Sequence, residues 1–444
     1  MSRLPSVRAE TVFDDFKPAY TPAQALAEAN RCLYCSDAPC ITACPTRIDI
    51  PEFIRKIATD NVKGSARTIF AANILGMSCA RVCPVEVLCV GSCVYNNMGV
   101  PPIQIGKLQR YSTDVAYERG WRFFEAGPDT GKRVACVGAG PASLACAHAL
   151  RRAGHAVTIF EKRAVVGGLN TTGVAPYKMK ADRADDEAAW VLGIGGIEVK
   201  HGVELGRDLD FAALERDFDA VFVGFGLGPD GWLHAEGEAL DGVFGAVEFI
   251  ERMKLGAVDL TDVKRALVIG GGNTAIDAVR ELVGLGIDDV SMVYRGAEAG
   301  MSGYAHEWAA AKVEGVRAAW RTQPIGYVGE GRVAGVRCVR LDDKKQTVPD
   351  SEHVVAADLV LLAIGQGRLG ALVAALDGVT VEHGRLVVDA DGFTGRPGWY
   401  AGGDAANGGK EVVNAAAEGK AAAHAIDRWL ARHSLRATEG ATHA

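Results

Sequence analysis

Eight cysteines between positions 32 and 93 are the residues of this chain best suited to metal chemistry. They fall into two groups of four, which are Cys32, Cys35, Cys40 and Cys44, and then Cys79, Cys83, Cys89 and Cys93. Proline follows directly after Cys44 and after Cys83. Thiolates at such short spacings, two of them followed by proline, are typical of iron–sulfur clusters, which mostly carry electrons. The cysteines therefore predict a redox protein.

The size and charge of the chain set limits on what it can be. Its 444 residues allow two to four domains, and 48% hydrophobic and 23% charged residues fit an ordinary soluble protein. A net charge of −7 predicts neither a nucleic-acid partner nor an anionic membrane partner. No apolar run approaches the ~18 residues of a membrane helix, and the N-terminus lacks the apolar core of an export signal. We expect a cytoplasmic protein whose reduced thiols hold metal.

A first dinucleotide-binding unit is predicted where a short apolar strand runs into a glycine turn at residues 132–143. The first glycine of such a turn allows the bend, the second lets the backbone approach a pyrophosphate, and a third small residue lets helix pack on strand. The following strand ends in an acid about twenty residues on, where it can bind a ribose hydroxyl. The expected contacts are Gly138, Gly140, Pro141, Ser143 and Glu161.

Two further segments indicate that the first nucleotide is FAD. Val165–Leu169 follows Glu161 closely, as in flavin disulfide-reductase-like proteins, and Gly398–Asp404 resembles the second flavin motif of that superfamily. Its aspartate contacts the ribityl chain, and Asp404 is interpreted as opening the helix at Val412–Lys420, where it could also be an N-cap. The expected flavin contacts are Gly168, Leu169, Lys178, Gly403, Asp404 and Val412.

A second strand–glycine–helix unit, at residues 264–275, predicts a nicotinamide site. Arg295 ends its second strand, where an acid would mark NAD; an arginine suggests the 2′-phosphate of NADP, but it could also stack on adenine. The choice between NADH and NADPH therefore stays open. The expected contacts are Gly270, Gly271, Gly272, Asn273, Thr274, Arg295, Ala363 and Gly365, the last two at a strand end that crosses back beside the nicotinamide.

These units predict an α/β protein with an all-α N-terminal iron–sulfur domain and two Rossmann-like dinucleotide-binding domains, the nicotinamide domain being inserted in the FAD domain. The expected divisions are residues 1–125 for the iron–sulfur domain, 126–245 and 366–444 for the FAD domain, and 246–365 for the NAD(P)H domain. Helical spacing is expected at Pro51–Ala58. The charged stretch Lys180–Glu187 is interpreted as a solvated helix face.

Together, the motifs resemble the electron-input half of dihydropyrimidine dehydrogenase, most closely the PreT-type subunit of the bacterial two-subunit enzyme. The resemblance covers nearly the whole chain. The small subunit of glutamate synthase shares the architecture and is the alternative. The segments that carry the resemblance are Cys35–Cys40, Leu88–Cys93, Pro102–Gly106, Gly138–Ser143 and Met301–Glu307.

The resemblance implies a crossed set of ligands for two [4Fe–4S] clusters. One cluster would be held by Cys32, Cys35, Cys40 and Cys93. The other would be held by Cys44, Cys83, Cys89 and Gln109, with Cys79 left as a spare thiol. Chains like the glutamate synthase subunit typically have a glutamate in place of this glutamine, so Gln109 favours the pyrimidine enzyme. Zinc is the alternative metal, but two zinc sites would not explain the flavin and nicotinamide motifs.

The implied function is oxidation of NADH or NADPH through FAD, with electrons leaving through the two clusters. The resemblance implies a hetero-oligomeric partner, a PreA-like subunit with FMN, which reduces uracil or thymine to the 5,6-dihydropyrimidine. The hard chemistry belongs to the cofactors, so no catalytic side chain is predicted. The alternatives are the small (beta) subunit of glutamate synthase and a non-catalytic iron–sulfur redox sensor or scaffold. Glu161 and Asp404 argue against the scaffold.

Overall fold

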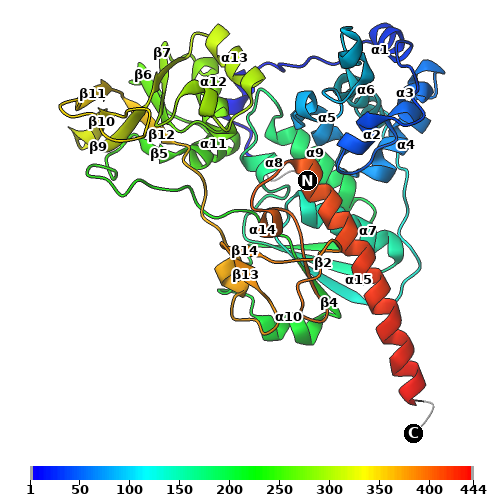
Figure 1. Ribbon diagram of the computed structural model, residues 1–444. Coiled ribbons are helices and arrows are strands. Elements are labelled where there is room, and N and C mark those ends of the chain that lie inside the picture. The colour runs from blue at the N-terminus through cyan, green and yellow to red at the C-terminus, as the bar shows by residue number, and fades with distance from the viewer. Residues whose placement is uncertain (1–3, 442–444) are drawn as a thin grey trace.

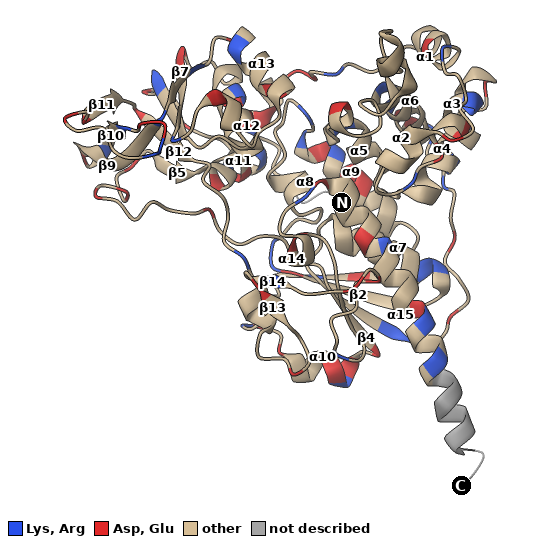
Figure 2. Ribbon diagram, viewed as in Figure 1, with Lys and Arg blue, Asp and Glu red and all other residues tan. Residues whose placement is uncertain are grey.

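The computed structural model describes residues 4–441, and the side chains of residues 4–433. Figure 1 shows a helical N-terminal region packed beside α15, a first sheet below it, and a second sheet set to one side. Lysine, arginine, aspartate and glutamate are interspersed over all three regions, as Figure 2 shows. Within the described residues, no helix combines the length and the apolar character needed to span a bilayer.

The N-terminal region is entirely helical, as expected. Helix α3 illustrates why these residues form helices: Ile50, Phe53, Ile54 and Ile57 recur on one face and are buried, and the Asp49 side chain accepts from the Glu52 amide to cap the first turn. The elements are η1 (Ala9–Val12), α1 (Pro22–Ala29), α2 (Pro39–Ala43), α3 (Ile50–Ala58), α4 (Val62–Ala72), α5 (Gly76–Val82), η2 (Val85–Val87), η3 (Val94–Met98) and α6 (Ile105–Glu118).

The first sheet is parallel, with strand order β15-β4-β1-β2-β3. Its strands are β1 (Arg133–Val137), β2 (Ala156–Glu161), β3 (Ile197–His201), β4 (Ala220–Val223) and β15 (Trp399–Ala401). Helices α7 and α15 pack against each other beside this sheet (Figure 1). The other elements of this region are α7 (Pro141–Ala153), α8 (Leu169–Thr172), α9 (Ala181–Leu192), α10 (Phe211–Asp217), η5 (Gly370–Val373), β13 (Val381–Glu382), β14 (Arg385–Leu386), α14 (Asp404–Asn407) and α15 (Val412–Ala441).

The second sheet is also parallel, with strand order β5-β12-β6-β7-β8, and the antiparallel strands β11-β10-β9 form a separate sheet beside it. The strands are β5 (Val243–Gly245), β6 (Arg265–Ile269), β7 (Asp289–Tyr294), β8 (Arg317–Trp320), β9 (Thr322–Glu330), β10 (Arg332–Arg340), β11 (His353–Ala356) and β12 (Leu359–Leu362). The helices are α11 (Ala246–Leu255), α12 (Asn273–Gly284), η4 (Glu298–Gly300) and α13 (Ala305–Val313).

The chain leaves the first sheet after β4 and returns to it at β15, so the second sheet is inserted in the first region, as expected. One expected boundary is wrong. Strand β5, placed by the sequence at the end of residues 126–245, pairs in parallel with β12 of the second sheet, with Val243 opposite Val360. The division therefore falls before Val243, because this short strand needs the open edge of the second sheet for its hydrogen bonds.

Candidate functional site

A cavity of about 770 Å³ lies where the first sheet, the second sheet and the iron–sulfur region meet. It brings together predicted contacts from segments far apart in the chain. These lining residues are Gly138, Gly140, Pro141, Glu161, Gly168, Leu169, Lys178, Asn273, Gly403, Asp404 and Val412. A cavity of this size and mixed lining fits a cofactor.

The glycine turn after β1 has the backbone geometry that the sequence predicts. Gly138 has a φ of +92°, and a Cβ there would approach the Gly224 carbonyl to 3.0 Å. Ser143 is fully buried on α7, and a Cβ on Gly224 would lie 2.2 Å from its Oγ. Ser143 therefore occupies the close helix–strand contact expected of a third small residue. Its partner in this contact is Gly224, which the sequence motif did not indicate.

Glu161 ends β2 with its carboxylate held at the cavity wall. Its Oε2 accepts from the Ala139 amide at 2.7 Å, and its Oε1 accepts from the Arg163 amide at 2.8 Å. The first of these bonds joins the acid to the glycine turn itself. Glu161 and the turn are therefore one rigid unit beside the space for a nucleotide.

Asp404 also lines the cavity, but its helix differs from the expected one. It is the first residue of the short helix α14, whose N-cap position is Gly403, while Val412 begins the separate helix α15. The positive φ of Gly403, +68°, makes the turn between β15 and α14. Burial raises the pKa of Asp404 to about 6, opposed by the hydrogen bond from the Lys410 amide. Asp404 thus does not cap α15.

The predicted nicotinamide turn lies at the end of β6 and the start of α12. Gly270 has a φ of +147°, and a Cβ there would lie 2.3 Å from the Ala363 carbonyl oxygen, so the two predicted segments touch. Asn273 reaches the large cavity, and its Oδ1 accepts from the Tyr304 amide at 2.9 Å. The remaining predicted contacts lie outside the cavity lining: Gly270, Gly271, Gly272, Thr274, Arg295, Ala363 and Gly365.

Lys178 connects the two dinucleotide regions inside this cavity. Its Nζ lies 2.8 Å from Asp277 Oδ1 on α12 and 2.8 Å from Glu307 Oε1 on α13. Burial acts to lower the pKa of Lys178, but Asp277 and Glu307 outweigh it and raise that pKa above its ordinary value. The sequence reasoning missed both acids. The sequence did contain a signal for one of them, because Asp277 lies one helical turn after Asn273 and therefore on the same face of the helix.

Further acidic and phenolic groups lie close to this cation. The Tyr177 hydroxyl donates to Asp277 Oδ1 at 2.5 Å, and the Tyr304 hydroxyl donates to Glu411 Oε1 at 2.7 Å. Burial raises the pKa of Glu411, and Tyr304 opposes that rise. The side of the cavity next to α12 and α13 is therefore lined by a network of hydrogen bonds and ion pairs.

Four of the cysteine thiols share one small apolar cavity of about 30 Å³. Cys93 of the second sequence group joins Cys32, Cys35 and Cys40 of the first around it, whereas Cys44 does not line it. Burial raises the pKa of Cys40 to about 12, and the Cys32 and Cys93 thiols add to the rise. Four convergent thiols in an apolar pocket fit the donor set of a [4Fe–4S] cluster, whose binding would release the thiol protons.

The other thiols lie next to one another at the end of α5. The Cys79, Cys89 and Cys44 thiols lie close enough to Cys83 to raise its pKa. A hydrogen bond with Cys79 is the largest cause and burial the second, and together they hold this pKa well above the ordinary value. Val82 and Pro84, on either side of Cys83, line the large cavity. This second group of thiols therefore lies on the side of the iron–sulfur region that faces the large cavity. Within residues 4–441, no three His, Cys, Asp or Glu side chains converge as ligands of a single metal ion.

For this second group, the sequence predicts Gln109 as the fourth ligand and leaves Cys79 as a spare thiol. Cys79 Sγ accepts from Asn73 Nδ2 at 3.1 Å. Gln109 is buried on α6 and donates from Nε2 to the Gly76 carbonyl at 2.7 Å. That bond occupies the amide nitrogen and leaves the amide oxygen as the atom that could ligate iron.

Known proteins resemble both halves of the chain. Residues 132–419 match the family described as pyridine nucleotide-disulphide oxidoreductase, and residues 8–121 match that described as dihydropyrimidine dehydrogenase domain II, 4Fe-4S cluster. The glutamate synthase [NADPH] small chain of Escherichia coli K12 is 35% identical over 94% of this chain and 94% of its own length. The NAD-dependent dihydropyrimidine dehydrogenase subunit PreT of Escherichia coli O157:H7 is 35% identical over 95% of this chain and 98% of its own.

Solved structures show the same fold for the dinucleotide regions. FprA from Mycobacterium tuberculosis superposes with a TM-score of 0.56 at 20% identity, covering 71% of this chain and 86% of FprA. Thioredoxin reductase of T. acidophilum gives 0.54 at 21% identity, covering 67% and 98%. These likenesses concern the fold alone.

The fold, the dinucleotide motifs and the thiol groups define an NAD(P)H-dependent oxidoreductase that uses FAD and 4Fe–4S clusters. The chain belongs to the pyridine nucleotide-disulphide oxidoreductase family, joined to an N-terminal domain of the dihydropyrimidine dehydrogenase 4Fe-4S type. The fold class and the resemblance that the sequence indicates are thereby confirmed.

Proposed function

We propose that this chain is the electron-input subunit of a dihydropyrimidine dehydrogenase: it oxidises NADH or NADPH and passes the electrons to an FMN-containing partner that reduces uracil or thymine. The observation that carries the proposal is the place of Cys83. Its neighbours Val82 and Pro84 share the wall of one cavity with the FAD motif residues Gly138 and Asp404. Electrons released in this cavity would therefore have a thiol-bound metal group beside them.

In this proposal, the electrons pass first to the thiol group beside the cavity and then to the group farther from it. Cys89 belongs to the thiol group beside the cavity, and the Cys40 thiol lies close enough to raise its pKa. The group beside the cavity therefore adjoins the group formed by Cys32, Cys35, Cys40 and Cys93, which we call the outer group. When bound, FAD takes a hydride (two electrons) from NAD(P)H and releases them singly to clusters that each accept one. In this proposal Cys32, Cys35, Cys40 and Cys93 hold the outer cluster, and Cys44, Cys83, Cys89 and Gln109 hold the inner one.

The protein groups of the cavity would orient the cofactors. Glu161 would bind the ribose of FAD, Gly138 and Gly140 would let the backbone approach its pyrophosphate, and Asp404 would contact the ribityl chain. On the nicotinamide side, the Asp277–Lys178–Glu307 network would hold α12 and α13 against the flavin region. These groups bind and position, and the hydride transfer belongs to the cofactors.

Glutamine at position 109 favours the pyrimidine enzyme, as does the PreT relative that matches 98% of its own length. The second candidate is the small chain of glutamate synthase, favoured by the equally identical relative of that name. The discriminating experiment is anaerobic co-purification with the native partner. The complex is then supplied with NADH or NADPH and with uracil, thymine, or 2-oxoglutarate plus glutamine. We expect turnover with the pyrimidines; turnover with the last pair alone would reject the proposal.

Cofactor content tests the remaining alternative, a non-catalytic scaffold or redox sensor. The purified chain should contain one FAD and two clusters of four irons. A chain that holds iron but binds no flavin, and that oxidises neither NADH nor NADPH with an artificial acceptor, would support the scaffold instead.

A further inference from the structure

Glu187 is buried although its sequence context predicts a solvated helix face. It lies on α9 of the FAD-binding region, only 1% of its surface is exposed, and it points into the iron–sulfur region. Its Oε1 accepts from the amides of Met77 and Ser78 at 3.0 and 3.1 Å, and its Oε2 accepts from the Ser78 hydroxyl. A buried carboxylate of one region therefore satisfies amides that the first turn of α5 leaves free in the other.

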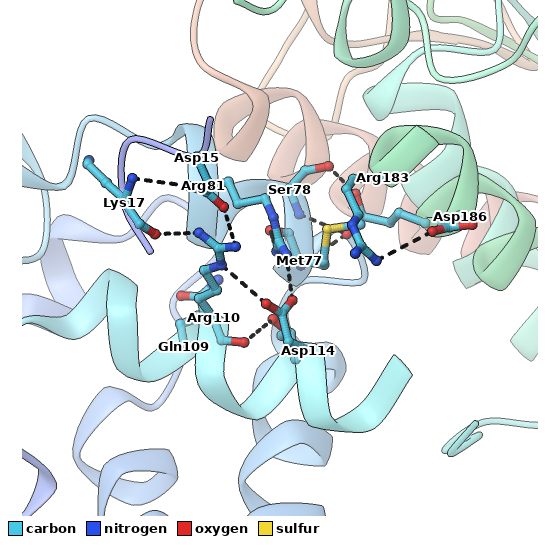
Figure 3. Close-up of polar contacts among 12 residues, drawn as sticks. Asp15, Lys17, Met77, Ser78, Arg81, Gln109, Arg110, Asp114, Arg183 and Asp186 are labelled. Atoms are coloured by element: carbon cyan, nitrogen blue, oxygen red, sulfur yellow. Dashed lines mark hydrogen bonds and ion pairs between the residues drawn. The ribbon is translucent and has the colours of Figure 1, made fainter. Parts of the chain in front are cut away.

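Helix α5 is the element that carries Cys79 and leads into Cys83. Its own N-cap residue, Leu75, supplies no side-chain hydrogen bond, so Glu187 takes that role from outside the region. The same helix is held on its other side by Arg81, whose guanidinium pairs with Asp114 at 2.7 Å (Figure 3). The FAD-binding region thus holds one end of α5, a helix of seven residues. Through this helix it fixes the position of the inner thiol group, which includes Cys79 and Cys83.

Asn170 extends this link to the large cavity. Its Nδ2 donates to Ser78 Oγ at 3.1 Å, while its Oδ1 is buried and has no hydrogen-bond partner among the described residues. Asn170 lies on α8 and lines the large cavity, and Lys254 donates to its backbone carbonyl at 3.3 Å. The Oδ1 atom is closed off from the open cavity, so other atoms of Asn170 line the cavity wall and its Nδ2 joins α8 to α5.

We propose that Asn170, Ser78 and Glu187 form a positioning chain between the cavity wall at α8 and the cluster-bearing helix α5. This inference rests on the proposed placement of FAD in the large cavity. The chain holds α5 at a fixed place relative to the cofactor, so that electron transfer from flavin to the inner cluster keeps its rate. None of the three residues carries electrons.

Ser78→Ala is the sharpest test, because it removes the hydroxyl in the middle of the chain and leaves the backbone amides that Glu187 accepts. The full chain, loaded with FAD and clusters, is mixed anaerobically with NADH or NADPH, and flavin reduction and cluster reduction are followed separately by stopped-flow absorbance and freeze-quench EPR. We expect unchanged flavin reduction and cluster reduction about tenfold slower, since a shift of ~1 Å in a reacting pair has large kinetic effects.

Matched variants separate positioning from simple loss of packing. Ser65→Ala removes another fully buried hydroxyl of the iron–sulfur region, one that bonds to Ser112 at 2.8 Å, and should leave both rates unchanged. Ser78→Thr keeps the hydroxyl and should restore the rate. Asn170→Leu should slow cluster reduction about as much as Ser78→Ala does, because it removes the donor to Ser78 Oγ.

The outcomes distinguish this inference from the proposed function. Cluster reduction by Ser78→Ala within twofold of the wild type, at equal iron and FAD content, would overturn the positioning chain. Cluster reduction at the wild-type rate in Asn170→Leu would overturn the link from α8 to α5. A wild-type chain that binds no FAD would instead reject the proposed function.

Discussion

The Nζ of Lys178 lies 2.8 Å from Oδ1 of Asp277, and this contact joins the flavin side of the molecule to the helix that carries the nicotinamide motif. Glu307 of α13 lies at the same distance from the ammonium group. All three side chains face the large cavity. One half-buried cation therefore links two helices of the inserted region.

Replacing Lys178 by methionine should loosen this contact. Two half-buried carboxylates would lose their cation and repel each other, which destabilises the contact between the two regions. We expect a lower thermal midpoint and a KM for NAD(P)H raised about tenfold, since misplaced binding groups weaken coenzyme capture. Steady-state oxidation of NADH and NADPH with an artificial acceptor measures KM and kcat separately.

Two variants in the same loop control for this change. Lys178→Arg keeps the charge and should retain most of the affinity. Lys180→Met removes a cation whose Nζ makes a 3.5 Å hydrogen bond to the Thr11 carbonyl, and it should behave like the wild type. If Lys178→Met and Lys180→Met had equal KM values, the interregion role of Lys178 would be wrong.

Gln109→Ala should disturb the inner cluster while Cys79→Ala leaves both clusters intact. The reason is the amide oxygen of Gln109, which the bond from Nε2 to Gly76 leaves for iron. EPR of the reduced chain and its iron content report the result, and Cys35→Ala, which removes a thiol of the outer group, serves as a positive control. Loss of a cluster in Cys79→Ala, with none in Gln109→Ala, would refute the crossed ligand set.

Arg295 offers a test of coenzyme choice. It is exposed just after β7, and no hydrogen bond or ion pair with another described residue engages its side chain. If it binds the 2′-phosphate, Arg295→Ala should lower kcat/KM for NADPH by about tenfold or more and leave NADH unaffected, because a charge-assisted bond is lost. Arg317→Ala, also on the surface of the second sheet, is the control. An equal loss with both coenzymes would place Arg295 on the shared adenine instead.

His148 should make the FAD-binding region sensitive to acid. Burial, with a smaller contribution from Arg152, lowers the pKa of His148 to about 3, so its native imidazole stays neutral while an unfolded histidine takes up a proton below about pH 6.5. The unfolded state then binds more protons, and stability falls as the pH decreases from about 6.5 towards 3. Between pH 7 and pH 5 the loss amounts to about 2 kcal/mol.

The variant His148→Leu should not show this loss of stability. Its thermal midpoint, relative to that of the wild type at the same pH, should therefore be higher at pH 5 than at pH 7. His433→Leu, at an exposed position of α15, is the matched control. A constant difference between His148→Leu and the wild type over this range would show that His148 is not held neutral.

Local features of the fold were predictable, because each depends on residues close together in sequence. Helix α3 was expected over Pro51–Ala58 and is observed over Ile50–Ala58, since its apolar spacing already defines one buried face. The glycine turn at Gly138 was predictable for the same reason. Strand β5 was not, because three residues of strand pattern do not tell which of two parallel sheets has the open edge.

The sequence by itself determined the chemistry of this protein: cysteine spacing, two glycine turns and an acid after a strand, each set by a few adjacent residues. Only the tertiary structure decided which groups meet. It placed Lys178 between Asp277 and Glu307, and it placed Glu187 at the N-terminus of α5 rather than in solvent. The physical reason is that such contacts join segments far apart in the chain, and packing of whole helices and sheets, rather than local propensity, brings them together.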